Sequence, residues 1–302
     1  MTESVPEVTP QLPSKRWRAI LAALERLPQA GLSRGFGRIA DTPVPPPLRN
    51  AIIGGFARLV GIDLDEAELP VTAYRSINDL FVRRLKPGVR AWPARPDIAA
   101  SPVDGVLGQS GRIHGGRLLQ AKGRWYTAAA LLDDNDEAAR FDGGAFVTIY
   151  LSPRHYHRIH TPIPGVIDKA RHVPGALLPV NEAAVMHVDG LFARNERLIC
   201  YLRGEVGRVV VAAIGAYNVG RISAAFDPHW RDGWVTNVPN ARAETKVYDP
   251  PRTVDTGDEI MAFHLGSTVV LLFEPGRVQL ERLEPGMEIR VGQPIARGQV
   301  TA

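Results

Sequence analysis

The hydrophobic pattern of the first 70 residues is that of amphipathic helices. Residues 1–13 are polar and proline-rich, and we expect a disordered tail there. After Ser14, which can cap a helix, apolar side chains recur at helical spacing, at Trp17, Ile20, Leu21, Leu24 and Leu27. A second set follows a proline-rich stretch, at Leu48, Ile52, Phe56 and Leu59. We therefore expect residues 14–70 to form a helical segment with one apolar face.

From about residue 97 the pattern changes to short β-type runs. Apolar, often β-branched stretches alternate with Gly and Pro turns, at residues 146–151, 209–214, 268–273 and 278–280. Ser76 is a candidate start for one more helix, and residues 283–295 carry the turn residues of a hairpin. The pattern predicts an α+β fold in which N-terminal helices precede a mainly β domain, residues 71–302, built as packed sheets or a distorted barrel.

Composition and charge limit the classes of partner. The chain has 302 residues, 45% of them hydrophobic, and a net charge of +4 with a pI near 9.4, so we expect a globular protein with an acidic partner. Zinc-finger spacings and the aromatic signature of RNA-binding sheets are absent from the sequence, which favours anionic lipid over nucleic acid. Cys200 is the only cysteine, so it cannot form an intrachain disulfide.

The same pattern predicts how the chain meets a membrane. No apolar run approaches the roughly 20 residues that span a bilayer. Lys15, Arg16 and Arg18 lie beside the first apolar stripe, where an anionic surface would use their charge. We expect peripheral attachment through residues 14–40 on the cytoplasmic face. The alternative is that these stripes pack on the protein's own core.

The step from Gly266 to Ser267, just before an apolar strand, is a candidate self-processing site. If Ser267 attacks the preceding carbonyl, the chain breaks and the serine can become a pyruvoyl group, an electrophile suited to decarboxylation. Gly266 suits such a bond because it lacks a Cβ and leaves its carbonyl open. Asp104 and three clustered histidines supply the other parts of an activated nucleophile. The histidines are His155, His157 and His160.

These residues leave three other functions open. A serine hydrolase would keep Asp104, His160 and Ser267 as a triad in an uncleaved chain, although Ser267 lacks a Gly-x-Ser-x-Gly elbow. A zinc hydrolase would use the three histidines, but the sequence has no HExxH motif. A non-enzymatic, carrier-like binding module would use the C-terminal hairpin, which lacks the lysine that such domains modify.

Several pieces, in order along about residues 70–296, together carry a resemblance to a known family. They are residues 81–88 (FVRRLKPG), 101–105 (SPVDG), 150–162 (YLSPRHYHRIHTP), 178–181 (LPVN), 191–197 (LFARNER) and 265–268 (LGST). In these pieces the chain closely resembles phosphatidylserine decarboxylases, the pyruvoyl-dependent enzymes of phospholipid synthesis. The motif at residues 216–221 (AYNVGR) departs from the family pattern, because Tyr217 and Arg221 are bulkier than expected there.

The resemblance implies conversion of phosphatidylserine to phosphatidylethanolamine through a Schiff base with a pyruvoyl cofactor made from Ser267. It implies that Asp104, His160 and Ser267 form the maturation triad, and that cleavage between Gly266 and Ser267 leaves a large β chain and a small α chain. His157 is the candidate that returns a proton to the carbanion after carbon dioxide leaves. The expected partners are phosphatidylserine and an anionic membrane surface, with no nucleic acid and no metal, and the sequence leaves a homo-oligomer open.

Overall fold

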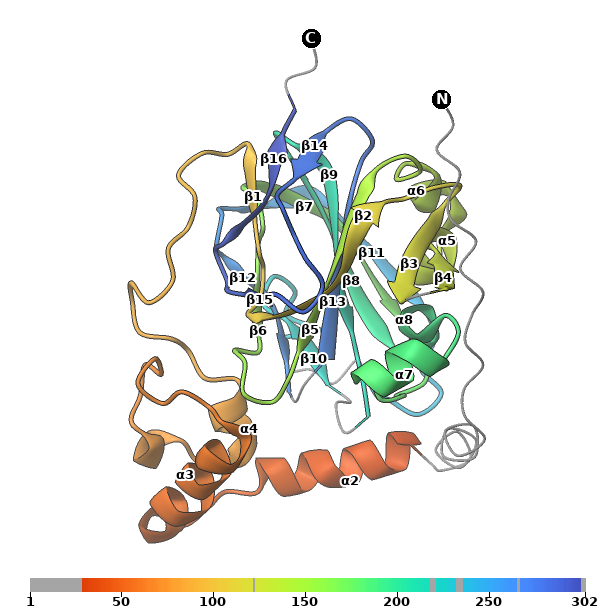
Figure 1. Ribbon diagram of the computed structural model, residues 1–302. Helices are drawn as coiled ribbons and strands as arrows, with labels where there is room; N and C mark the ends of the chain where they lie inside the picture. The colour runs from red at the N-terminus through yellow and green to blue at the C-terminus, as the bar shows by residue number, and fades with distance from the viewer. Residues whose placement is uncertain (1–28, 122, 218–220, 232–235, 265–266, 300–302) are drawn as a thin grey trace.

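The protein has a mainly β body with the N-terminal helices gathered at one end (Figure 1). The computed structural model describes residues 29–121, 123–217, 221–231, 236–264 and 267–299. The predicted tail at residues 1–13 and the apolar stripe from Trp17 to Leu27 lie outside these residues. The predicted α+β class is confirmed. In the described chain, the β body consists of antiparallel sheets that do not close into a barrel.

The N-terminal helices build a small core of their own. They are α2 (Gln29–Asp41), α3 (Arg49–Val60) and α4 (Ile77–Phe81), with 3-10 turns at Pro46–Leu48 and Val71–Ala73. The helix predicted around residues 48–59 is confirmed as α3, whose Ile53 and Ala57 pack with Leu80 of α4. Ser76 caps α4 by accepting a hydrogen bond from the Asp79 N–H. None of the described helices is long and apolar enough to cross a membrane.

An eight-stranded antiparallel sheet forms the centre of the body. The predicted runs at residues 146–151, 209–214 and 268–273 are adjacent strands in it, so those predictions are confirmed. In spatial order the strands are β11 (Glu244–Val254), β7 (Gly165–Val173), β8 (Arg197–Gly204), β9 (Gly207–Ile214), β13 (Ser267–Phe273), β5 (Ala145–Leu151), β2 (Gly105–Arg112) and β15 (Glu288–Ile289).

Apolar residues predominate on both faces of the central strands because both faces of the sheet are covered. On β13, Val269, Leu271 and Phe273 point into one core, whereas Val270 and Leu272 point into the other. The first core is closed by two smaller sheets. Four short helices contribute to the second: α5 (Ala128–Leu132), α6 (Asn135–Ala139), α7 (Glu182–His187) and α8 (Leu191–Arg194).

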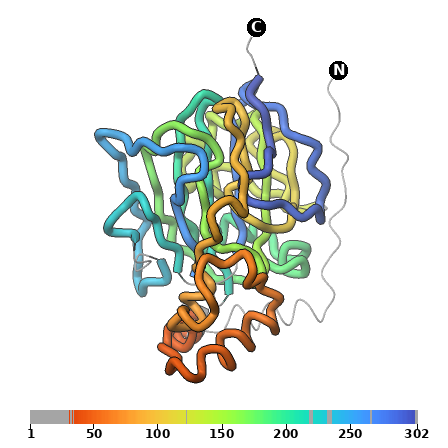
Figure 2. Tube along the Cα trace, turned by 90° about the vertical axis from the view of Figure 1, so that its left-hand side faces the viewer, coloured from red at the N-terminus to blue at the C-terminus, as the bar shows by residue number. Residues whose placement is uncertain are grey.

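Smaller sheets complete the body. One contains β10 (Ile222–Ala224), β12 (Glu259–Phe263) and β6 (Arg158–His160); another contains β1 (Ile98–Ala100), β16 (Pro294–Gly298) and β14 (Val278–Leu280); a third pairs β3 (Arg117–Ala121) with β4 (Arg124–Thr127). The hairpin predicted over residues 283–295 is wrong. β15 pairs with β2, whereas β16 pairs with β1 and β14, so the C-terminal tail connects two sheets. Figure 2 shows this blue tail lying along the body, away from the red helices.

Candidate active site

The chain crosses between the large sheet and the β10-β12-β6 sheet at two neighbouring places. β5 leads into β6, and β12 leads into β13. The register places Ser267 opposite Leu151, the last residue of β5. The Phe263 N–H, at the end of β12, donates to the His157 carbonyl at 2.9 Å. These pairings bring the predicted histidine segment beside the start of β13.

Ser267 lies at the centre of this junction. It is fully buried, and the next residue, Thr268, pairs with Tyr150 on β5 and with Ile214 on β9. Within the described structure, the Ser267 hydroxyl has no hydrogen-bond partner. Leaving a buried polar group unsatisfied costs about 1–3 kcal/mol, so such a group needs an explanation. A role as a reacting group provides one.

His157 is fully buried against Phe81 of α4, with 4.2 Å between the ring centres. Its Nδ1 donates to the His155 carbonyl at 2.8 Å, which leaves a lone pair on Nε2. Nε2 has no partner among the residues that the structure describes. Burial lowers the pKa of His157 to about 3, so the ring is neutral near pH 7. His157 therefore presents a neutral ring nitrogen, with no described partner, inside the protein.

His160 lies three residues later, at the end of β6, in different surroundings. Its Nδ1 donates to the Gly257 carbonyl at 2.6 Å, and its Nε2 accepts from the Tyr156 hydroxyl at 2.9 Å. The ring stacks on Tyr156 and packs against Trp92. Gly257 has a φ of +89°, and a Cβ there would lie 2.6 Å from Trp92, so only glycine fits. Burial lowers the pKa of His160, and both ring nitrogens are already bonded.

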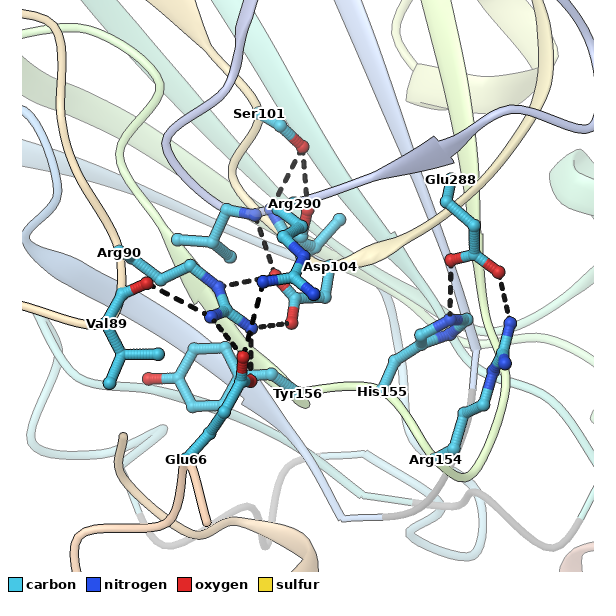
Figure 3. Close-up of polar contacts among 12 residues, drawn as sticks. Glu66, Val89, Arg90, Ser101, Asp104, Arg154, His155, Tyr156, Glu288 and Arg290 are labelled. Carbon is cyan, nitrogen blue, oxygen red and sulfur yellow. Dashed lines mark hydrogen bonds and ion pairs between the residues drawn. The ribbon is translucent and has the colours of Figure 1, made fainter. Parts of the chain in front are cut away.

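Asp104 immediately precedes β2 and is held by Arg90 (Figure 3). Arg90 donates to both carboxylate oxygens, at 3.1 and 2.5 Å, and the Val291 N–H donates at 2.7 Å. The same guanidinium also binds Glu66, at 3.0 and 2.7 Å. Its hydrogen bond lowers the pKa of Glu66. Arg90 thus fixes two carboxylates that come from distant parts of the chain.

His155 belongs to a separate cluster, also shown in Figure 3. Its Nδ1 accepts from the Ser152 N–H at 2.9 Å, so the proton lies on Nε2, which faces Glu288 at 3.3 Å. Glu288 also pairs with Arg154. Burial lowers the pKa of His155. The three histidines therefore have three different sets of partners. Across the described ranges, no three His, Cys, Asp or Glu side chains come close enough to hold a metal ion.

The predicted triad residues lie at the same end of the large sheet without bonding to one another in the described structure. β5 separates Asp104 from Ser267, because β2 and β13 pair with its two edges. Two strand spacings amount to about 10 Å. In register, His157 is opposite Phe263 and His160 is opposite Glu259, so His157 is nearer to the end of β12 that leads to Ser267. The triad stays a prediction.

Several residues of this region were not predicted from the sequence. Arg83 is buried and donates to the carbonyls of Arg154 and His155, whereas its Nε and Nη1 have no described partner. A cleft of about 380 Å³ borders His160 and is lined by Arg84, Lys86, Arg90, Trp92 and Tyr156, among others. The run of basic residues after Phe81 was the available signal. It did not indicate which of them would be buried.

Comparisons with known proteins point to a single family. A family model described as phosphatidylserine decarboxylase matches residues 77–297. A phosphatidylserine decarboxylase proenzyme from Anaeromyxobacter sp. (strain K) is 47% identical over 279 residues, which cover 92% of this chain and 98% of the relative. Proteins with the same name from Myxococcus xanthus (strain DK1622) and Shewanella frigidimarina (strain NCIMB 400) are 40% and 41% identical. Those alignments cover 92% and 90% of this chain, and 98% and 95% of the relatives.

Proposed function

Because this chain belongs to the phosphatidylserine decarboxylase family, we propose that it decarboxylates phosphatidylserine with a pyruvoyl group made from its own Ser267. The observation that carries the proposal is the buried Ser267 hydroxyl, which has no described partner and shares its junction with the free Nε2 of His157. The relatives are named proenzymes, which supports self-processing. The pyruvoyl group supplies a carbonyl that binds the serine amine and accepts the electrons released with carbon dioxide.

The chain makes this group by internal cleavage. Ser267 Oγ attacks the carbonyl of Gly266, and the amide becomes an ester as the serine nitrogen takes up the proton. A base then removes the Cα proton of residue 267, the Cβ–Oγ bond breaks as the Cα–Cβ double bond forms, and Gly266 leaves as a carboxylate. Hydrolysis of the remaining enamine releases ammonia and leaves the pyruvoyl end. The products are a large β chain ending at Gly266 and a small α chain of residues 267–302.

We assign the base of this maturation step to His160, oriented by Asp104, as the family resemblance implies. His160 Nε2 accepts from the Tyr156 hydroxyl, so the assignment requires that hydroxyl to turn away or to relay the proton. The backbone N–H of His160 donates to the carbonyl of Pro102, two residues before Asp104, so the two residues belong to one local structure.

His157 carries the proton of the decarboxylation. Its neutral ring, with Nδ1 committed to the His155 carbonyl, can accept a proton only at Nε2. A proton that enters the site with the substrate protonates the ring only transiently, because burial keeps its pKa near 3. The ring later returns that proton to the carbon that has lost carbon dioxide. Because burial disfavours the imidazolium, this return is favourable.

The helical end of the molecule is the proposed membrane contact, on the cytoplasmic face. Six large apolar side chains between residues 36 and 69 are exposed, and Arg38 and Arg58 are exposed beside them. The apolar residues are Phe36, Ile39, Leu48, Ile52, Leu59 and Leu69. Exposed apolar side chains next to basic ones suit the interface of an anionic bilayer. A substrate embedded in a bilayer requires the enzyme at that surface.

Intact-mass spectrometry of the purified protein and of Ser267→Ala tests the proposed function. Wild type should give two fragments, and the smaller should begin with a pyruvoyl group and resist Edman sequencing. Ser267→Ala should remain one chain because no hydroxyl can attack Gly266. Ser267→Cys should retain slower cleavage, since a thiol is also a nucleophile. A wild type that stays uncleaved while it decarboxylates phosphatidylserine would overturn the proposed pyruvoyl group. An uncleaved wild type that instead hydrolyses esters would favour the serine hydrolase alternative.

A further inference from the structure

The short helix α4 contacts the chain on the N-terminal side of Ser267. Asn78, in its first turn, is buried, and its Nδ2 lies 3.2 Å from Nδ1 of His264, a residue 186 positions later. Three residues on, Phe81 packs against His157. One five-residue helix therefore touches both the candidate proton carrier and the segment that leads to the cleavage bond.

His264 is held at three points. An amide nitrogen is a donor, so Asn78 Nδ2 donates to Nδ1. The remaining ring proton then lies on Nε2 and is donated to Ser223 Oγ of β10 at 3.1 Å. The backbone N–H of His264 donates to the Arg221 carbonyl at 3.0 Å. Burial lowers the pKa of His264 to about 4, so this neutral pattern persists at physiological pH.

The other side of the cleavage bond is fixed by the sheet. Ser267 begins β13 opposite Leu151, and all seven residues of β13 are buried between β5 and β9. Attack of a hydroxyl on the carbonyl next to it demands a defined approach, and a misplacement of 1 Å can cost about 10²-fold in rate. The sheet can hold the nucleophile in place, but the carbonyl that it attacks belongs to Gly266, two residues after His264 in the sequence.

We infer that His264 is a positioning residue for self-cleavage, tied by Asn78 of α4 and Ser223 of β10 so that the chain before Ser267 stays aligned with its hydroxyl. The inference rests on the proposed cleavage between Gly266 and Ser267. It also explains why polar side chains occupy this partly buried place. A hydrogen-bonded polar pair fixes geometry that apolar packing would leave adjustable.

The test is the rate of self-cleavage of full-length precursor made by cell-free synthesis and followed by gel. His264→Leu and Asn78→Leu should each slow cleavage by about 10- to 100-fold, because they release the anchored segment. Together they should slow it no more than His264→Leu alone, since that change already removes the contact with Asn78. His264→Gln keeps a donor and an acceptor on a side chain of similar reach. It should recover most of the wild-type rate.

Ser76→Ala is the matched control. It removes the cap of the same helix, and so weakens α4, without touching the Asn78–His264 pair. Melting temperatures of all variants, measured in a Ser267→Ala background, reveal any loss of folding. The inference is wrong if His264→Leu and Asn78→Leu cleave at the wild-type rate, or if Ser76→Ala slows cleavage as much as Asn78→Leu does. A wild type that does not cleave would instead overturn the proposed function.

Discussion

His157 and His160 are three residues apart, yet their rings have opposite hydrogen-bonding states. His160 has both nitrogens bonded, to Gly257 and Tyr156, and lies beside the open cleft. His157 has one free nitrogen and no exposed surface. A free nitrogen can exchange protons with a bound substrate, whereas a bonded one must first lose a partner. This difference separates the effects expected of the two substitutions.

His157→Ala should still self-cleave, at least in part, yet fail to decarboxylate phosphatidylserine. His160→Ala should stop at the uncleaved precursor, because the maturation base is gone. Cleavage is measured by gel, and decarboxylation by release of carbon dioxide from labelled phosphatidylserine in mixed micelles. Wild-type turnover by His157→Ala would remove its role as proton carrier. Complete cleavage of His160→Ala would move the base role to another residue.

Asp104→Asn keeps an oxygen for the Val291 N–H but removes the charge that Arg90 neutralises. If Asp104 orients the maturation base, cleavage should slow by up to about 10⁴-fold, the typical loss when a triad carboxylate becomes an amide. Glu66→Gln alters the other carboxylate on the same guanidinium and should cleave nearly normally. Time-resolved mass spectrometry measures both rates. Equal slowing would mean that the Arg90 cluster matters only as a structural unit.

Helices α2 and α3 expose apolar side chains that the rest of the described chain does not use. Ile39 and Leu59 are 69% and 84% exposed, and Figure 1 places both helices at one end of the molecule. Ile39→Asp with Leu59→Asp should weaken binding to phosphatidylserine-containing vesicles in co-sedimentation. Val247→Asp is the control, since Val247 is 75% exposed on β11 of the β body. Equal binding by the helix variant and wild type would place the membrane contact elsewhere.

Local sequence predicted individual helices and strands better than it predicted their partners. The apolar run at residues 268–273 indicated a strand, and the structure has β13 there, with every residue buried. The turn residues at 283–295 indicated a hairpin, but β15 and β16 pair with strands far away in sequence. Gly and Pro signal where a chain turns. They carry no information about which edge the next strand will meet.

The same limit applies to the site. Asp104, His157, His160 and Ser267 were found because their neighbours in sequence match a family, and the structure places them at one end of a sheet. Asn78 and His264 were missed because an Asn in one short helix gives no hint of a His 186 residues away. Contacts of that kind depend on tertiary packing alone.

The large sheet makes the two expected chains inseparable under native conditions. Residues 267–299 supply β13, β14, β15 and β16, and β13 lies between β9 and β5 with every residue buried. Each of its five apolar side chains contributes about 1.5–3 kcal/mol by burial. After cleavage, a tag on either chain should therefore retrieve both. Size-exclusion chromatography should separate them only in denaturant, and separation in native buffer would contradict this arrangement.

Burial lowers the pKa of four histidines at the helical end of the β body, and this makes the whole fold sensitive to acid. They are His155, His157, His160 and His264. In the unfolded chain each titrates near 6.5, whereas in the fold His157 and His264 titrate near 3 and 4. Between those values the unfolded state binds more protons. The stabilisation is therefore complete above pH 6.5 and is lost as the pH falls.

Each such group can lower the free energy of unfolding by up to about 1.4 kcal/mol per pH unit within that window. Urea unfolding of the uncleaved Ser267→Ala protein between pH 7 and 5 measures how steeply the free energy of unfolding changes with pH. This window lies above the range in which the carboxylates of Glu66 and Asp227 take up protons, because the pKa values of both are lowered. Adding His157→Gln should reduce the slope by about one proton, whereas replacing the exposed His114 by Gln should leave it unchanged. If His157→Gln leaves the slope at its wild-type value, His157 is not held neutral by the fold. Its assignment as a buried, neutral proton carrier would then be wrong.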